Sequence, residues 1–189
     1  VLYLASVLRE EGHGVRLVDA DMDALNSSEV LRAISDYEPK VVGITMNSLQ
    51  ARPAYEIADL IRAENPGAKI VVGGPHPSAL REKILKKSRS IDAVVYGEGE
   101  ATFSELARAF DEERDLEHIK GICFRDGDEI VANEPRDLIA DLDSIPMPAL
   151  DLAEPIRRYP GAYPVGGRSS IQVMASRGCP FNCTFCSNP

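Results

Sequence analysis

Three cysteines near the end of the sequence have the spacing of ligands to a metal cluster. They are Cys179, Cys183 and Cys186, in a C-x3-C-x2-C pattern. Disulfides do not account for them, because three thiols leave one over and the loops between them are too short to bridge. An iron–sulfur cluster normally takes four cysteine ligands, so three would leave one iron open to bind a substrate. The pattern therefore predicts a cluster that takes part in chemistry.

Zinc is the alternative metal for these thiols. Cys183 and Cys186 form a C-x2-C pair, which is half of a four-ligand zinc site. The sequence has no second C-x2-C pair and no H-x3-H pair, and its three histidines are distant from the cysteines. An iron–sulfur cluster is therefore the favoured prediction, and a zinc site or unliganded thiols are the alternatives.

The cysteine pattern, with Phe185 directly before the last cysteine, resembles the cluster motif of radical S-adenosylmethionine (SAM) enzymes. The resemblance implies that Cys179, Cys183 and Cys186 hold a 4Fe-4S cluster and that Phe185 lies near the adenine of SAM. In that family the open iron binds SAM, and an electron from the cluster cleaves it to a deoxyadenosyl radical. The implied partners are a small-molecule substrate and an electron donor such as flavodoxin or ferredoxin.

Composition and charge narrow the class of protein. The chain has 189 residues, enough for one large domain, and a net charge of −9. The negative charge argues against nonspecific binding to nucleic acid, which needs a basic surface. No apolar run is long enough to span a bilayer, so we expect no membrane insertion. Clustered free cysteines fit a reducing compartment, and we expect a cytoplasmic protein.

Residues 1–110 alternate between helical and strand patterns, which predicts a parallel sheet with helices on both faces. The expected strands are Val15–Asp19, Val41–Thr45, Lys69–Gly73 and Ala93–Tyr96. Apolar residues at helical spacing lie before, between and after these strands. Thr102 and Glu105 have the spacing of a capping box at the start of the last helix.

The character of the sequence changes after about residue 112. Gly121–Phe124 and Glu129–Ala132 predict a β-hairpin, and the proline-rich residues 133–168 predict a linker with extended segments. Ile171–Ala175 is expected to be a strand that carries the cysteines at its carboxyl end. We therefore expect an α/β domain with its hairpin over residues 1–132, a linker over 133–168, and the truncated start of a radical SAM barrel over 169–189.

The expected topology of the first domain is doubly wound, flavodoxin-like or Rossmann-like. Flavodoxin-type sheets have the strand order 2-1-3-4-5, in which the first strand is central. This sequence begins in the helix that would follow that strand. We therefore expect the domain to lack its first strand, which would leave Val15–Asp19 and Val41–Thr45 with no partner between them.

Ligands of such sheets bind beyond the carboxyl ends of the strands. The strand ends expected there, at residues 19–20, 45–48, 73–76 and 97–100, include two that are rich in glycine. As a set they resemble the cobalamin-binding domain that precedes the radical SAM barrel in one large subgroup, a resemblance that extends from Leu2 to Ser187. The matching stretches are Leu2–Ser6, Glu11–Val15, Val71–His76, Gly97–Glu100 and Asp143–Pro148. The residues that the resemblance implies as cobalamin contacts are Thr45, Asn47, Ser48, Gly73, Gly74, Gly97, Glu98 and Gly99.

Two features near these loops have simpler interpretations than catalysis. Where a histidine ligates cobalt in cobalamin-binding domains, it lies in a D-x-H-x-x-G loop after the first strand, so we expect His76 to be a loop hydrogen-bonder. Glu98 and Glu100 could be mistaken for a catalytic carboxylate pair. Glu100 instead precedes a predicted helix, and negative charge is favourable at a helix N-terminus.

The resemblance implies a cobalamin-dependent radical SAM enzyme, most often a methyltransferase in which cobalamin carries the methyl group. A cobalamin-dependent radical SAM cyclase of tetrapyrrole synthesis is the first alternative. The second is a non-catalytic module that binds a nucleotide or cobalamin and has a structural metal site. Methylthio-transferring radical SAM proteins are disfavoured, because they carry further upstream cysteines and only Cys123 lies upstream here. We expect the 189-residue chain alone to be inactive.

Overall fold

The computed structural model describes residues 1–153, 174, 176–179, 181 and 183–186. The chain divides into two units, residues 1–153 and residues 154–189. The secondary structure given below belongs to the first unit.

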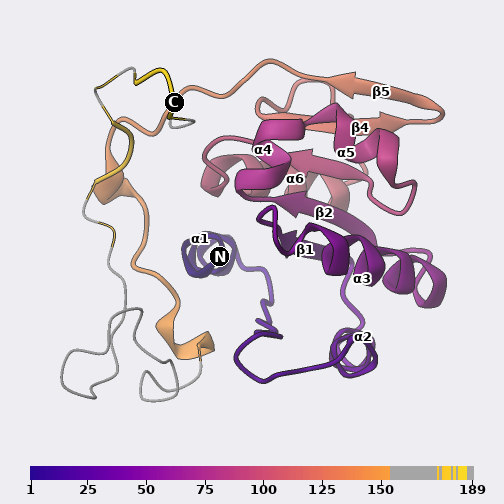
Figure 1. The fold of residues 1–189 in the computed structure, drawn as a ribbon. Coiled ribbons are helices and arrows are strands. Elements are labelled where there is room, and N and C mark those ends of the chain that lie inside the picture. Colours follow the sequence, from indigo (N-terminus) through magenta and orange to yellow (C-terminus); the bar gives the residue numbers. More distant parts are fainter. Residues whose placement is uncertain (154–173, 175, 180, 182, 187–189) are drawn as a thin grey trace. The chain divides into compact units, whose positions relative to one another are not determined.

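A five-stranded sheet forms the centre of this unit (Figure 1). Its strands lie in the order β1 (Val41–Thr45), β2 (Lys69–Gly73), β3 (Ala93–Val95), β4 (Ile122–Asp126) and β5 (Glu129–Ala132). The first three are parallel, and β4 and β5 are antiparallel to their neighbours. The predicted parallel sheet and hairpin are thus confirmed. The hairpin also extends the same sheet beyond β3, which the sequence did not predict.

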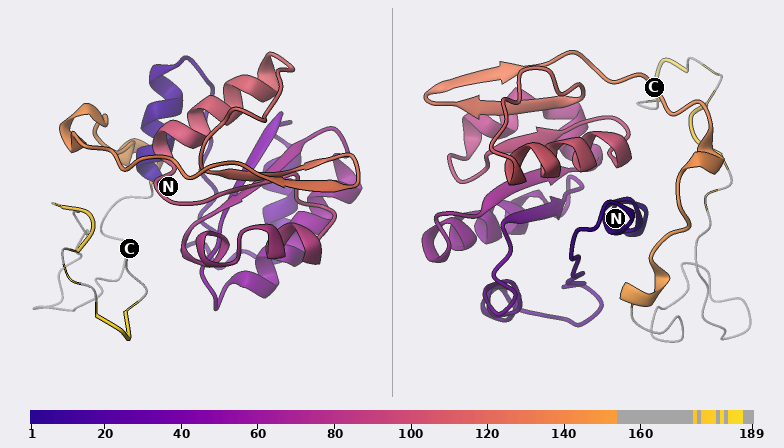
Figure 2. Two further views of the ribbon diagram at one scale, coloured as in Figure 1. Left: turned by 90° about the horizontal axis from the view of Figure 1, so that it is seen from above. Right: turned by 180° about the vertical axis from the view of Figure 1, so that it is seen from behind.

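Helices cover both faces of the sheet (Figure 2). They are α1 (Leu2–Glu10), α2 (Ser27–Ser35), α3 (Ala51–Glu64), α4 (Pro75–Leu80), α5 (Glu82–Lys87) and α6 (Glu100–Asp111). Helices α3, α4 and α5 lie on one face and α6 lies on the other, with α1 beside it. None of the helices in the described part of the chain is long and apolar enough to cross a membrane.

Alternate residues of the central strands supply the two cores. Ile70 and Val72 of β2 belong to the cluster that includes α3 and α5, and Val71 belongs to the cluster that includes α6. All three side chains are at most 2% exposed. Side chains of a strand point alternately to opposite faces, so an uninterrupted apolar run is what a strand buried on both faces requires.

The prediction of a strand at Val15–Asp19 is wrong. Residues 13–19 have no strand assignment, and β1 is the end strand of the described sheet. An apolar run becomes a strand only when its backbone groups pair with a neighbour. Among the described residues, no strand pairs with this segment.

The predicted capping box at Thr102 and Glu105 is also wrong. Helix α6 begins two residues earlier, at Glu100, with Gly99 as its N-cap. The Thr102 hydroxyl donates to the carbonyl of Lys120 and accepts a hydrogen bond from Arg136. The Thr102 hydroxyl thus bonds to residues distant in the sequence and does not cap the N-terminus of the helix. Glu100, which was predicted to precede the helix, is its first residue, and it still places negative charge at the helix N-terminus.

The predicted linker is described as far as residue 153. It contains two short 3-10 helices, η1 (Leu142–Ser144) and η2 (Leu150–Leu152). The expected strand at Ile171–Ala175 lies outside the described residues, apart from Met174. The predicted domain boundaries remain predictions.

Candidate cofactor site

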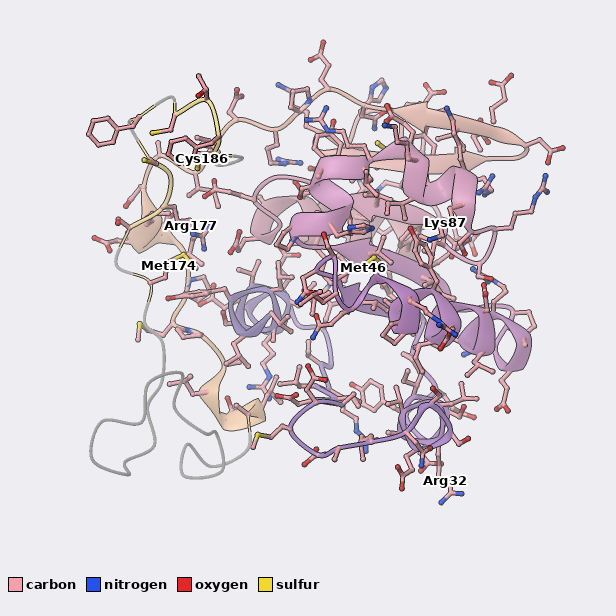
Figure 3. The ribbon with its side chains drawn as sticks, viewed as in Figure 1. Arg32, Met46, Lys87, Met174, Arg177 and Cys186 are labelled. Atoms are coloured by element: carbon pink, nitrogen blue, oxygen red, sulfur yellow. The ribbon has the colours of Figure 1, made fainter. Side chains whose placement is uncertain are left out.

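The loops after β1, β2 and β3 lie at one edge of the sheet, because parallel strands end on the same side. Backbone hydrogen bonds join the first two loops directly. The Met46 amide donates to the carbonyl of Gly73 over 2.9 Å, and the His76 amide donates to the carbonyl of Met46 over 3.2 Å. Met46, labelled in Figure 3, is fully buried beneath this junction.

The loop after β1 is held in shape by its own side chains. The Asn47 Oδ1 accepts hydrogen bonds from the amides of Leu49 and Gln50, both over 2.9 Å. The Ser48 Oγ lies 3.1 Å from the His76 Nδ1, so the predicted loop hydrogen bond of His76 is confirmed. The loop therefore enters α3 in a fixed conformation, with Thr45, Asn47 and Ser48 exposed.

Gly73, the last residue of β2, and Gly74, which follows it, differ in what a side chain would meet. Gly74 has a φ of +106°, and a Cβ there would lie 2.9 Å from the carbonyl oxygen of Met46. The protein's own backbone thus requires a glycine at this position. A Cβ on Gly73 would meet nothing closer than 3.7 Å. Gly73 is therefore the position where an added methyl group tests contact with a ligand.

The loop after β3 has open space at Gly97, and contacts with other parts of the protein hold it in place. Gly97 has a φ of +76°, and a Cβ there would meet nothing within 4 Å. Its amide donates to the Ser78 Oγ over 3.2 Å. The Glu98 Oε2 accepts a hydrogen bond from the Ile139 amide over 2.5 Å, and a Cβ on Gly99 would lie 3.2 Å from Leu4. The side chain of Glu98 is thus engaged by the protein itself.

The structure adds two residues to this edge that the sequence did not single out. Leu49 is 93% exposed, although large aliphatic side chains are usually buried. Ser78 of α4 supports the loop after β3 through Gly97. Leu49 could have been singled out from the sequence, because it directly follows Ser48. The role of Ser78 could not be predicted in this way, because it depends on a contact between residues 19 positions apart.

The three cysteines lie on one short segment of the second unit. All three are exposed and none of them is in a disulfide, and the Cys186 amide donates to the Cys183 carbonyl over 3.0 Å, which closes a tight turn. Phe185 in that turn is 91% exposed. Within the described residues, no three His, Cys, Asp or Glu side chains are grouped as they would be around a metal ion. Three accessible thiolates are nevertheless the donor set that iron–sulfur clusters use.

A large cavity lies away from these loops, at the amino ends of β1 and β2. Its volume is about 960 Å³, and its lining includes Lys40, Lys69 and Asp111. An ion pair joins Lys40 to Asp111, and it lowers the pKa of that carboxyl group. Because ligands of open α/β sheets bind at the carboxyl ends of the strands, the candidate site is not this cavity.

The chain is similar to a known domain family and to known enzymes. The family model of the B12 binding domain matches residues 1–107. An uncharacterised methyltransferase of Pyrococcus horikoshii is 39% identical over 187 residues, which cover 98% of this chain and 39% of that protein. An anaerobic magnesium-protoporphyrin IX monomethyl ester cyclase of Synechocystis is 32% identical, over 98% of this chain and 37% of the cyclase.

A solved structure agrees with these sequence comparisons. The apo form of the cobalamin-dependent SAM radical enzyme OxsB has a TM-score of 0.74 and 28% identity, and the match covers 98% of this chain and 25% of OxsB. The chain thus spans less than two fifths of the length of the two curated relatives named above. The relatives named here are thus a methyltransferase, a cyclase and a cobalamin-dependent SAM radical enzyme. Because the family match covers more than half of its residues, the chain belongs to the B12-binding domain family.

Proposed function

We propose that this chain is the cobalamin-binding and cluster-binding part of a cobalamin-dependent radical SAM methyltransferase. The observation that carries the proposal is the B12-binding match, which includes all three loops at the carboxyl edge of the sheet. The 39% identity to a methyltransferase, over 98% of this chain, supports methyl transfer as the reaction.

The residues at the edge fit a large, flat ligand with amide side chains. Gly97 leaves open space above its Cα, and Leu49 offers an exposed apolar side chain. Asn47 uses its oxygen within the loop, which leaves its amide NH2 as a donor. These residues, with Thr45, Ser48, Gly73 and Gly74, would hold cobalamin.

The cysteine segment would hold the second cofactor. Cys179, Cys183 and Cys186 would be three ligands of a 4Fe-4S cluster, and Phe185 would lie near the bound SAM. When bound, cobalamin supplies methyl transfer and the cluster supplies the electron that cleaves SAM. An external electron donor such as flavodoxin or ferredoxin would serve the cluster, and the methyl acceptor would be a small molecule.

A cyclase is the second candidate function. The observation in its favour is the 32% identity to the Synechocystis cyclase over 98% of this chain. The two reactions differ in the fate of the SAM methyl group, because only a methyltransferase passes it to cobalamin and then to a product.

The test uses the longer protein that contains this chain, reconstituted without oxygen. We expect about four irons and four sulfides per chain, SAM cleavage, and transfer of a labelled methyl group from SAM to cobalamin. Cys183→Ala should abolish SAM cleavage while cobalamin binding remains. SAM cleavage without methyl transfer would favour the cyclase. Zinc without sulfide would contradict both candidates and indicate a structural metal site.

A further inference from the structure

Residues 136–153, here called the strap, lie along the α/β domain in the described structure. The strap lies in the proline-rich segment and contains the 3-10 helices η1 and η2. It follows β5 and does not pair with that strand. It belongs to the same unit as the sheet, and the second unit begins at residue 154. Figure 2 shows it running beside α1.

The first half of the strap is fixed to α6 and to the loop after β3. The Arg136 Nε donates to the Thr102 Oγ1 over 2.8 Å, and its guanidinium also pairs with Glu105. Three residues later, the Ile139 amide donates to the Glu98 Oε2 over 2.5 Å. Hydrogen bonds to a carboxylate are stronger than those between neutral groups. The strap is therefore tied directly to the loop that carries Gly97.

The second half of the strap is fixed to α1. The Ala149 amide donates to the Leu2 carbonyl over 3.2 Å, and Ala149 is 7% exposed. The Arg9 guanidinium contacts both carboxylate oxygens of Asp151, at 2.9 and 2.7 Å. The hydrogen bond from Arg9 holds the pKa of Asp151 below its ordinary value. This pair is exposed, so it orients the strap more than it stabilises the fold.

Helix α1 in turn contacts the loop after β3. A Cβ on Gly99 would lie 3.2 Å from the Leu4 Cδ2, which is tighter than most such contacts. The loop therefore meets the strap by two routes, directly through Glu98 and indirectly through Leu4 and α1.

We propose that Glu98 is a positioning residue whose carboxylate clamps the strap to the loop after β3, so that a ligand at that loop and the order of the strap are coupled. The identity of the ligand rests on the proposed cobalamin site. The clamp itself rests only on contacts within the first unit. It fixes the first half of the strap against the α/β domain.

The clamp is tested first without ligand, by hydrogen exchange on the chain. A hydrogen bond to a charged group contributes enough for Glu98→Ala to speed exchange of the Ile139 amide about tenfold. Glu98→Gln keeps an acceptor oxygen and should restore slow exchange. Glu134→Ala is the matched control, because it removes a nearby exposed carboxylate that takes no part in these contacts. Exchange at Val71 of β2 reports any global loss of stability.

Coupling is tested with hydroxocobalamin as the added ligand. In the wild-type chain at saturation, exchange across the strap should slow several-fold, and Glu98→Ala should lose that protection while it still binds. Unchanged exchange in a wild-type chain that binds cobalamin would overturn the coupling but leave the cobalamin site intact. Absence of binding would overturn the proposed function and the coupling together. Unaltered Ile139 exchange in unliganded Glu98→Ala would overturn the clamp itself.

Discussion

The Ser48 Oγ and the His76 Nδ1 lie 3.1 Å apart and join the loop after β1 to the first turn of α4. A backbone hydrogen bond from the His76 amide to the Met46 carbonyl joins the same two segments. His76 is therefore part of the scaffold that shapes two of the three loops. This role differs from that of a histidine held free to ligate a metal ion.

His76→Ala should leave the absorption spectrum of bound cobalamin unchanged, because the imidazole serves the loop and does not ligate cobalt. Affinity for cobalamin should fall by a few-fold, since the variant loses about 1 kcal/mol of loop-ordering hydrogen bond. Spectra of the wild-type and variant complexes provide the measurement. A shift in the cobalt-dependent bands of the variant would show that His76 is a ligand.

Gly74→Ala should lower the free energy of unfolding by about 2 kcal/mol or more, because the new Cβ meets the Met46 carbonyl in a backbone conformation that only glycine adopts easily. Gly97→Ala should cost about 1 kcal/mol, since its φ is positive but its surroundings are open. Urea unfolding of both variants tests whether Gly74→Ala loses more stability than Gly97→Ala. Equal losses of unfolding free energy in the two variants would mean that the contact with the Met46 carbonyl does not destabilise Gly74→Ala.

Cys123 should be unreactive in the folded chain, in contrast to the exposed Cys179, Cys183 and Cys186. Burial raises the pKa of the Cys123 thiol to about 11, so about 0.1% of it is thiolate at pH 8. Titration with a disulfide reagent at pH 8 should therefore show three fast thiols, and a fourth only in denaturant. Four fast thiols in the native chain would contradict the burial of β4.

Glu11 should make the attachment of α1 sensitive to acid. Burial alone would raise its pKa, but hydrogen bonds from Ser104 and Arg108 outweigh burial and lower it. A carboxyl group whose folded pKa is lowered stabilises the fold when ionised, and this stabilisation is lost as pH falls through the folded pKa.

Stability should therefore decline as pH falls from about 5 to about 3, and Glu11→Gln should decline less over that range. At neutral pH the variant should be less stable by about 0.5 kcal/mol, because the ion pair with Arg108 is partly exposed. Glu117→Gln, at an exposed position, is the control. Identical pH profiles for wild type and Glu11→Gln would show that the Glu11 contacts do not hold α1.

The sequence was most informative where local pattern decides structure. Val41–Thr45 and Lys69–Gly73 were predicted with the bounds that β1 and β2 have, because both are apolar runs of β-branched residues between turn signals. Gly12 is a further local signal, because it lies just beyond α1 and has a φ of +88°, which favours glycine after a helix. The loops of the candidate site followed from the positions of these strands.

Contacts between distant residues were not predictable from one sequence. Val15–Asp19 has a strand pattern without a pairing partner among the described residues, and pattern alone does not reveal that. The contacts of Arg9 with Asp151 and of Glu98 with Ile139 join residues 142 and 41 positions apart. The contact of Glu98 with the strap was not predicted, and its contact with cobalamin stays a prediction.

Cobalamin binding at the carboxyl edge of the sheet is tested most directly at Gly73. Gly73→Ala adds a methyl group at the last residue of β2, and Gly67→Ala adds one two residues before β2 begins. At both positions the new Cβ meets nothing closer than 3.7 Å in the protein. Both variants should fold with wild-type stability. Equilibrium dialysis against hydroxocobalamin should show binding weakened at least about tenfold in Gly73→Ala and unchanged in Gly67→Ala. Equal affinities for wild type and both variants would contradict a cobalamin site packed against Gly73.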